Sequence, residues 1–115
     1  MIIITIEMDV PISKQKEFLQ TLIVIIERIR MENACISCDF LKDVGFDNRY
    51  SVIGKWEKED DLHNHLSSED FSVLRGAMSL LHNPPDVSLY VVSSNKRLDA
   101  LNKTSEKHKT NNLRT

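Results

Sequence analysis

The residues best suited to chemistry lie close together, between Tyr50 and Phe71. A strand-like segment ends at Trp56, three acidic residues follow at the expected start of a helix, and His65 falls on the apolar side of that helix. Histidine titrates near neutral pH and can accept a proton from an acidic phenol or enol. We therefore take His65 and Trp56 as candidate catalytic residues. The alternative stays open that the histidine only stabilises a helix break and the tryptophan only fills the core.

A flat cavity is expected beside these two residues. Strand residues two apart share a face, so Val52 and Gly54 should lie on the same side as Trp56, and Gly54 leaves room beside the indole. The next helix would line the opposite side. The candidate substrate-binding residues are Tyr50, Val52, Phe71, Leu74 and Arg75. Among them, Tyr50 and Arg75 could hold an oxygen atom or an acidic group, and such a cavity suits a flat aromatic substrate.

Cys35 and Cys38 form a Cys-x-x-Cys motif, which elsewhere marks a thiol redox pair or half of a zinc site. Here the motif falls in a strand-like segment, where residues three apart point to opposite faces. No second cysteine pair completes a zinc site, although His63 and His65 are present, and His63 is expected to be solvated. The motif therefore favours two free structural thiols, with a metal or redox role as the less favoured alternative.

Hydrophobic periodicity predicts the order strand, helix, strand, strand, helix, strand. Residues 1–8 and 87–92 are strand-like and apolar on both faces. Residues 14–31 carry apolar side chains at helical spacing, with Ser13 as the expected N-cap.

A hairpin and a broken helix are expected between these elements. Residues 35–41 and 50–56 are joined by turn-forming residues, which predicts an antiparallel hairpin. The second helix should begin at residues 59–61, break with a new N-cap at Ser67, and end before the Pro84-Pro85 pair.

This order matches an α+β fold, the ferredoxin-like βαββαβ sheet with both helices on one face. Two helices cover only one side of such a sheet, yet the first and last strands are apolar on both sides. We therefore expect a second copy of the same sheet to cover the other side, in a homodimer.

Length and charge suggest one domain and a tail. The chain has 115 residues; residues 1–95 hold nine Lys and Arg against fifteen Asp and Glu, and residues 96–115 hold six against two. We expect a domain at 1–93 and a polar, basic tail at 94–115, with a short helix near 96–102 and otherwise flexible.

No nucleic-acid footprint, membrane span or signal peptide is evident, so a cytoplasmic protein is expected by default. No phosphate loop, paired carboxylates or catalytic triad is present either.

A further set of residues is shared with a known family. It comprises Ala34-Cys35-Ile36-Ser37, Arg49-Tyr50, Trp56, His65, Ser68, Phe71 and Pro84-Pro85. The set resembles the antibiotic biosynthesis monooxygenase domain family over roughly residues 1–93. The resemblance implies a dimeric α+β barrel. It also implies oxidation of phenols, anthrones or quinols by molecular oxygen, with no metal or flavin cofactor.

Three positions depart from the family pattern. Gly54 stands where many members have Glu, and Val52 stands where the polyketide-oxidising branch has an Asn that handles substrate. Arg75 stands about where the haem-degrading branch has its iron-binding histidine.

The leading hypothesis is therefore a homodimeric, cofactor-independent monooxygenase that acts on a hydroxylated aromatic or quinol. His65 would be its base or hydrogen-bond partner. Two alternatives remain: an isomerase acting on a small carbonyl metabolite, and a non-catalytic dimer that binds a small molecule or is purely structural.

Overall fold

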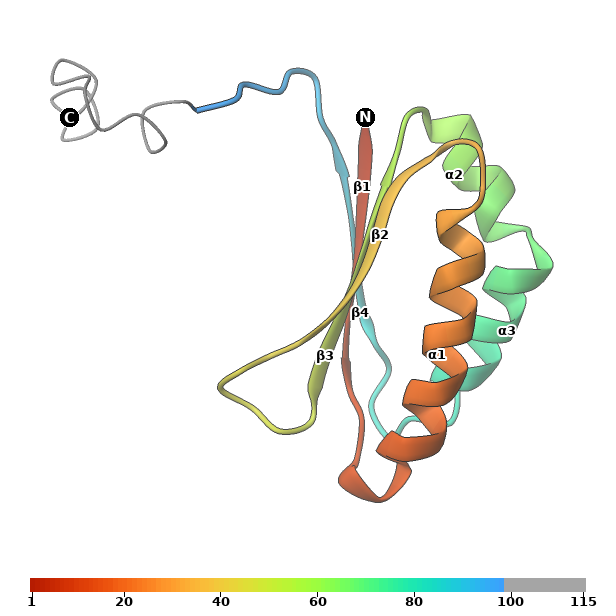
Figure 1. The fold of residues 1–115 in the computed structure, drawn as a ribbon, viewed down its shortest axis with the longest axis vertical. Helices are drawn as coiled ribbons and strands as arrows, with labels where there is room; N and C mark the ends of the chain where they lie inside the picture. Colours follow the sequence, from red (N-terminus) through yellow and green to blue (C-terminus); the bar gives the residue numbers. More distant parts are fainter. Residues whose placement is uncertain (99–115) are drawn as a thin grey trace, which may run out of the picture.

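A computed structural model describes residues 1–98, in which one four-stranded sheet is covered by helices on one face (Figure 1). The elements are β1 (Ile2–Asp9), the 3₁₀ turn η1 (Ile12–Lys14), α1 (Gln15–Arg30), β2 (Cys35–Lys42), β3 (Arg49–Trp56), α2 (Glu59–Leu66), α3 (Glu69–Met78) and β4 (Asp86–Val91). The strands are ordered β2-β3-β1-β4, and every neighbouring pair is antiparallel. The predicted ferredoxin-like α+β fold is confirmed.

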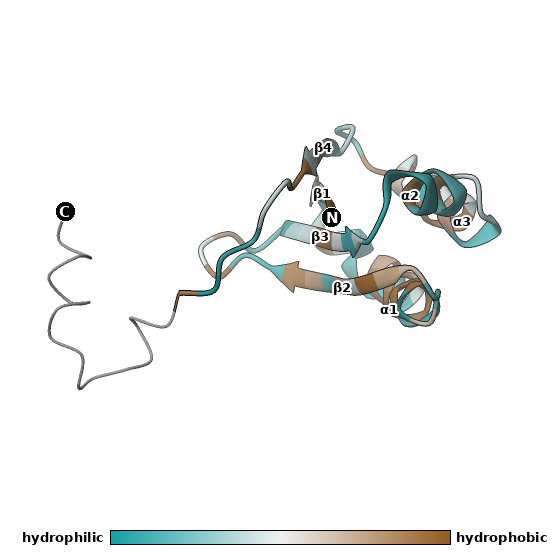
Figure 2. Ribbon diagram, turned by 90° about the horizontal axis from the view of Figure 1, so that it is seen from above, coloured by the Kyte–Doolittle hydropathy of each residue, from teal (hydrophilic) through white to brown (hydrophobic). Residues whose placement is uncertain are grey.

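The helix-facing side of the sheet forms the core. Ile2, Ile4, Ile6 and Met8 of β1 are buried, whereas the residues between them are partly or fully exposed. This alternation places the even-numbered residues of β1 under the helices. From α1 come five buried side chains at helical spacing, namely Phe18, Leu22, Ile25, Ile26 and Ile29. In Figure 2 the helices lie on one side of the strands and turn much of their hydrophilic surface outward.

The start of α1 differs from the prediction. After Pro11 the chain enters η1, where Lys14 N donates a hydrogen bond to Pro11 O at 2.9 Å. Ser13 already lies within that turn, so it cannot cap the helix, and Lys14 at the N-cap position supplies no side-chain hydrogen bond. The expected Ser13 cap is therefore wrong.

The expected break in the second helix is confirmed, one residue further along than predicted. The Ser68 side chain, not that of Ser67, accepts a hydrogen bond from Phe71 N at 3.2 Å. Ser67 instead lies at the C-cap of α2. The break leaves α2 as a short helix whose position depends on packing against the sheet and α3.

Two surfaces of the sheet are not covered within residues 1–98. On β4, Val87, Leu89 and Val91 lie opposite buried β1 residues, yet they are 57%, 44% and 69% exposed. The face away from the helices carries Ile3, Ile53 and Tyr90 among polar side chains such as Thr5 and Lys55. The first and last strands thus present apolar groups on both faces, as predicted, although the face opposite the helices is mixed rather than uniformly apolar.

Most of the expected tail at 94–115, and of the helix near 96–102, lies outside the described residues; residues 94–98 form neither helix nor strand. Among the described helices, none is long and apolar enough to cross a membrane.

Candidate active site

Trp56 and His65 meet in the core between β3 and α2. Their rings stack with centroids 4.6 Å apart and planes 25° apart, and Phe71 meets the imidazole edge-on at 5.4 Å. His65 is 5% exposed and Trp56 is 2% exposed. The sequence-based prediction that these side chains converge therefore agrees with the structure.

Local structure explains this meeting. Trp56 is the last residue of β3 and lies opposite Ile2 of β1, so its indole covers one end of the core. Leu62 is completely buried and anchors α2, and His65 follows almost one turn later on the same face. Both side chains therefore reach the helix-facing side of the sheet.

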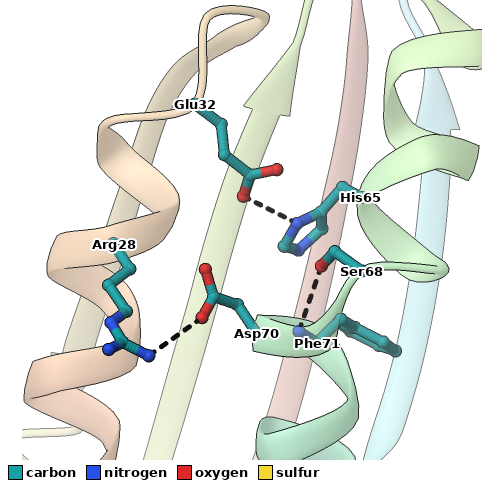
Figure 3. Close-up of polar contacts among 6 residues, drawn as sticks. All are labelled: Arg28, Glu32, His65, Ser68, Asp70 and Phe71. Carbon is teal, nitrogen blue, oxygen red and sulfur yellow. Dashed lines mark hydrogen bonds and ion pairs between the residues drawn. The ribbon is translucent and has the colours of Figure 1, made fainter.

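A carboxylate approaches the imidazole from the turn that follows α1. Glu32, in the turn between α1 and β2, places Oε2 2.9 Å from His65 Nδ1 (Figure 3). Both atoms are fully buried, and neither forms a hydrogen bond within residues 1–98. Burying two polar atoms without a hydrogen bond is costly, so the close approach of this carboxylate to the imidazole requires an explanation. The polar contact of His65 is made by Nδ1, and the second ring nitrogen, Nε2, is not part of it.

A cavity of about 20 Å³ adjoins this cluster. Its walls are apolar apart from His65 and Cys38, and they consist of Ile4, Ile6, Ile29, Cys38, Val52, Gly54, Trp56, His65, Phe71 and Leu74. A Cβ at Gly54 would lie 3.3 Å from Trp56 Nε1, so the glycine does leave room for the indole. The cavity holds roughly one water-sized molecule, whereas a cavity of about 150 Å³ is known to bind benzene. An aromatic substrate does not fit this conformation.

The predicted substrate-binding residues divide into two groups. Val52, Phe71 and Leu74 line the cavity with Trp56 and His65. Tyr50 faces the same side of the sheet but lies six residues from Trp56, about 20 Å along the strand. Its hydroxyl donates a hydrogen bond to Gln15 Oε1 at 3.2 Å, and its ring stacks on Phe40 at 5.5 Å. Tyr50 therefore belongs to the other end of the core.

Arg75 lies outside the cavity. It is exposed, its Nη2 donates a hydrogen bond to Leu66 O at 3.2 Å, and its guanidinium lies 5.1 Å from the centre of the Phe71 ring. This cation–π contact covers Phe71 from the solvent side. The structure thus places Arg75 behind Phe71 and does not bring it to His65.

The prediction that the two cysteines point to opposite faces of the sheet is wrong. A β-bulge between Cys35 and Ser37 shifts the register, so that Cys35 lies opposite Trp56 and Cys38 lies opposite Gly54. Because one extra residue changes strand parity, both thiols are on the helix-facing side. Both are free thiols in this structure.

Burial makes both thiols poor nucleophiles. It raises the pKa of Cys38 to about 12, with the neighbouring Cys35 adding to the rise. Burial also raises the pKa of Cys35, assisted by the charge of Glu32. Thiolates are the reactive form, so the arrangement does not favour thiol chemistry at neutral pH.

No metal-binding cluster is evident in the described part of the chain. Within residues 1–98, no three His, Cys, Asp or Glu side chains lie close enough to hold an ion together. His63, on the far side of α2, is 65% exposed and 3.9 Å from Glu59, so its expected solvation is confirmed.

Glu32 is the site residue that sequence reasoning did not find. It is 33 positions from His65 and belongs to a turn without a recognisable motif. Its proximity results from how the end of α1 packs over the sheet. The nearest sequence signal was the apolar environment expected around His65, which implies that a buried imidazole needs a polar partner.

The chain matches the family model described as "Antibiotic biosynthesis monooxygenase" over residues 1–76. The chain belongs to this family. A search of curated proteins found no match.

Solved structures share the fold of this family member. A proposed antibiotic biosynthesis monooxygenase from Deinococcus radiodurans has a TM-score of 0.79 and 16% identity, covering 85% of this chain and 98% of that chain. A conserved protein from Methanosarcina mazei Go1 has a TM-score of 0.73 and 20% identity, covering 77% of this chain and 89% of that chain. At these identities the similarity demonstrates the fold alone.

Proposed function

We propose that this family member is a monooxygenase that uses His65 as its base and needs no metal or flavin. The observation that carries the proposal is the buried imidazole, which stacks on Trp56, meets Phe71 edge-on and places Nδ1 next to a carboxylate. Family membership supports oxygenase chemistry in general. The substrate class is our inference: a small hydroxylated aromatic or quinol.

The proposed reaction begins when His65 Nε2 accepts a proton from the substrate. The resulting anion is electron-rich enough to transfer an electron to molecular oxygen, and the two radicals combine at carbon. The imidazolium returns its proton to the peroxide anion, and loss of water then leaves one oxygen atom in a product carbonyl. For an activated methylene group the sum is CH₂ plus O₂ giving C=O plus H₂O. An apolar wall around the anion favours the electron transfer because it excludes water.

Substrate entry requires a change at Phe71. The cavity of about 20 Å³ is too small for an aromatic ring. Phe71 is partly exposed in the first turn of α3, whereas Trp56 and Leu74 are deeply buried. We therefore propose that Phe71, with Arg75 outside it, forms the wall that moves.

Oxygen consumption with a panel of hydroquinones and anthrones tests the proposal. His65→Ala and His65→Gln should lower turnover by about 100-fold or more, the range expected for loss of a general base. His63→Ala, on the exposed side of the same helix, is the matched control and should retain full turnover. Unchanged turnover in a folded His65 variant would contradict the proposed role.

The small cavity favours a second candidate. An isomerase acting on a small carbonyl metabolite needs a smaller opening than an oxygenase of aromatic substrates, and a purely structural dimer needs none. Both alternatives predict no oxygen uptake. Product formation from a small carbonyl compound would distinguish the isomerase from a binding protein, which would show only thermal stabilisation by ligand.

We also propose a homodimer, as is typical of the family. Support comes from Ile3, Ile53 and Tyr90 on the face away from the helices, and from the exposed side chains of β4. A cytoplasmic location remains a prediction from sequence.

A further inference from the structure

The proposed function assigns a role to His65 but none to Glu32, whose carboxylate lies 2.9 Å from the imidazole. Within residues 1–98, Glu32 Oε2 and His65 Nδ1 are the only fully buried side-chain polar atoms without a hydrogen bond. An unpaired buried polar group is costly, and such groups concentrate where function requires them. His65 also lines the small cavity, whereas Glu32 does not.

The backbone holds Glu32 in place. Its N–H donates a hydrogen bond to Ile29 O at 3.0 Å, and its carbonyl accepts one from Cys35 N at 3.0 Å. The residue thus links the last turn of α1 to the first residue of β2. The carboxylate reaches His65 from this anchored turn and leaves its other side partly exposed, since the Glu32 side chain is 30% exposed (Figure 3).

Two aromatic neighbours restrict the orientation of the imidazole. Trp56 stacks against one face at 4.6 Å, and Phe71 meets the ring from a different direction at 5.4 Å. Rotation of the ring about its long axis would break the stacking. Nδ1 therefore stays directed toward Glu32, and the carboxylate is the group that must move to align an oxygen with the N–H.

We propose that Glu32 is the positioning residue for His65. Its carboxylate holds the imidazole with the proton on Nδ1, which leaves the lone pair of Nε2 free to accept a proton from substrate. It also stabilises the imidazolium that forms after the transfer. Carboxylates perform this role for histidine in other active sites, where they select the tautomer and orient the ring. The inference deepens the proposed function and rests on it for its catalytic meaning.

Other charged groups nearby do not substitute for Glu32. Arg75 lies on the solvent side of Phe71, and Arg30 donates a hydrogen bond to Cys38 O at 2.7 Å. Arg28 pairs with Asp70 at 3.3 Å at a separate point between α1 and α3 (Figure 3). The thiols of Cys35 and Cys38 lie on the same face as Trp56, and burial keeps both protonated at neutral pH. Glu32 is therefore the carboxylate that faces the imidazole.

The tautomer of His65 tests the inference without any substrate. Long-range ¹H–¹⁵N spectra of the imidazole distinguish a proton on Nδ1 from one on Nε2. The wild-type protein should show the Nδ1–H form, and Glu32→Ala should move the population toward the Nε2–H form that free histidine favours in water. Glu32→Gln preserves the shape of the side chain and replaces the alanine variant if that variant unfolds. It should weaken the preference of the imidazole for the Nδ1–H form. Glu27→Gln is the matched control, because Glu27 is an exposed carboxylate of α1 that pairs with Arg30 at 2.9 Å, and it should change nothing.

Turnover provides the second measurement. Glu32→Gln should lower kcat by about 10-fold to 100-fold, the usual effect of removing a residue that orients a functional histidine, and should leave KM nearly unchanged. A wild-type protein with the proton on Nε2, or a tautomer that is the same in all variants, would overturn the inference. Absence of oxygen uptake together with a tautomer that depends on Glu32 would overturn the proposed reaction and support the positioning contact.

Discussion

Cys38 should make the protein less stable in alkaline solution, and the size of the effect can be worked out. Its side chain is buried next to Gly54, and burial raises its pKa from 9.0 to about 12. In the unfolded chain the thiol ionises above its ordinary pKa, whereas in the folded chain it keeps its proton. Between these two values the folded state binds more protons, so stability falls as the pH rises.

The perturbation is Cys38→Ala, compared with wild type at about pH 8 and about pH 10. Over this interval a thiol with a folded pKa of about 12 and an unfolded pKa of 9.0 loses about 1.3 kcal/mol of stabilisation. Over the same interval, the free energy of unfolding of Cys38→Ala should fall by less than that of wild type, and the difference should equal this contribution. Other groups that titrate in this range, including Lys and Tyr side chains, are present in both proteins and cancel in the comparison.

Urea unfolding at both pH values measures the difference, provided that the m-value stays constant. The alanine variant should be somewhat less stable at the lower pH, because it leaves a small void in the core. The difference in free energy of unfolding between the two proteins should then narrow or reverse at the higher pH. Parallel loss of stability in the two proteins would refute the reasoning and show that the Cys38 thiol ionises as freely in the folded state as in the unfolded one.

Two further predictions concern access to the site and assembly. Phe71→Ala should let a phenol-sized ligand bind next to His65, measured by chemical-shift changes, while the Ser68 cap survives because it uses only the backbone N–H at position 71. An unchanged spectrum with phenol present would mean that Phe71 is not the movable wall. The protein should elute as a dimer in size-exclusion chromatography with light scattering, and Tyr90→Asp, on the face away from the helices, should weaken that dimer. Leu80→Asp, 68% exposed and just beyond α3, is the control, and a monomeric wild type at micromolar concentration would contradict the proposed assembly.

Patterns repeated along the chain predicted the fold well. The alternation in β1 and the helical spacing of α1 each involve many side chains, so no single residue decides them. The hairpin and the break before α3 followed from turn and capping residues. The Ser13 cap failed because Pro11 starts a 3₁₀ turn one residue too early for it, a detail that depends on a single hydrogen bond.

The site was less predictable because tertiary packing builds it. Trp56 and His65 were found because each stands on the apolar side of a recognisable element. Glu32 was missed because it sits in a turn, far away in sequence, and Cys35 was misplaced because one inserted residue reversed its direction. Tyr50 and Trp56 lie on the same face of β3, but they are about 20 Å apart along the strand. Two residues on one face therefore need not line the same cavity.

The helix that carries His65 has only eight residues. An isolated helix of this length does not persist in water, so α2 keeps its shape only while Leu62 and His65 stay docked in the core. His65, the side chain proposed to move a proton, is therefore also one of the two buried side chains that anchor α2. Amide hydrogen exchange across residues 59–66 measures how firmly the helix is anchored. Among substitutions at position 65, only those that preserve the wild-type exchange pattern isolate the chemical step from local unfolding.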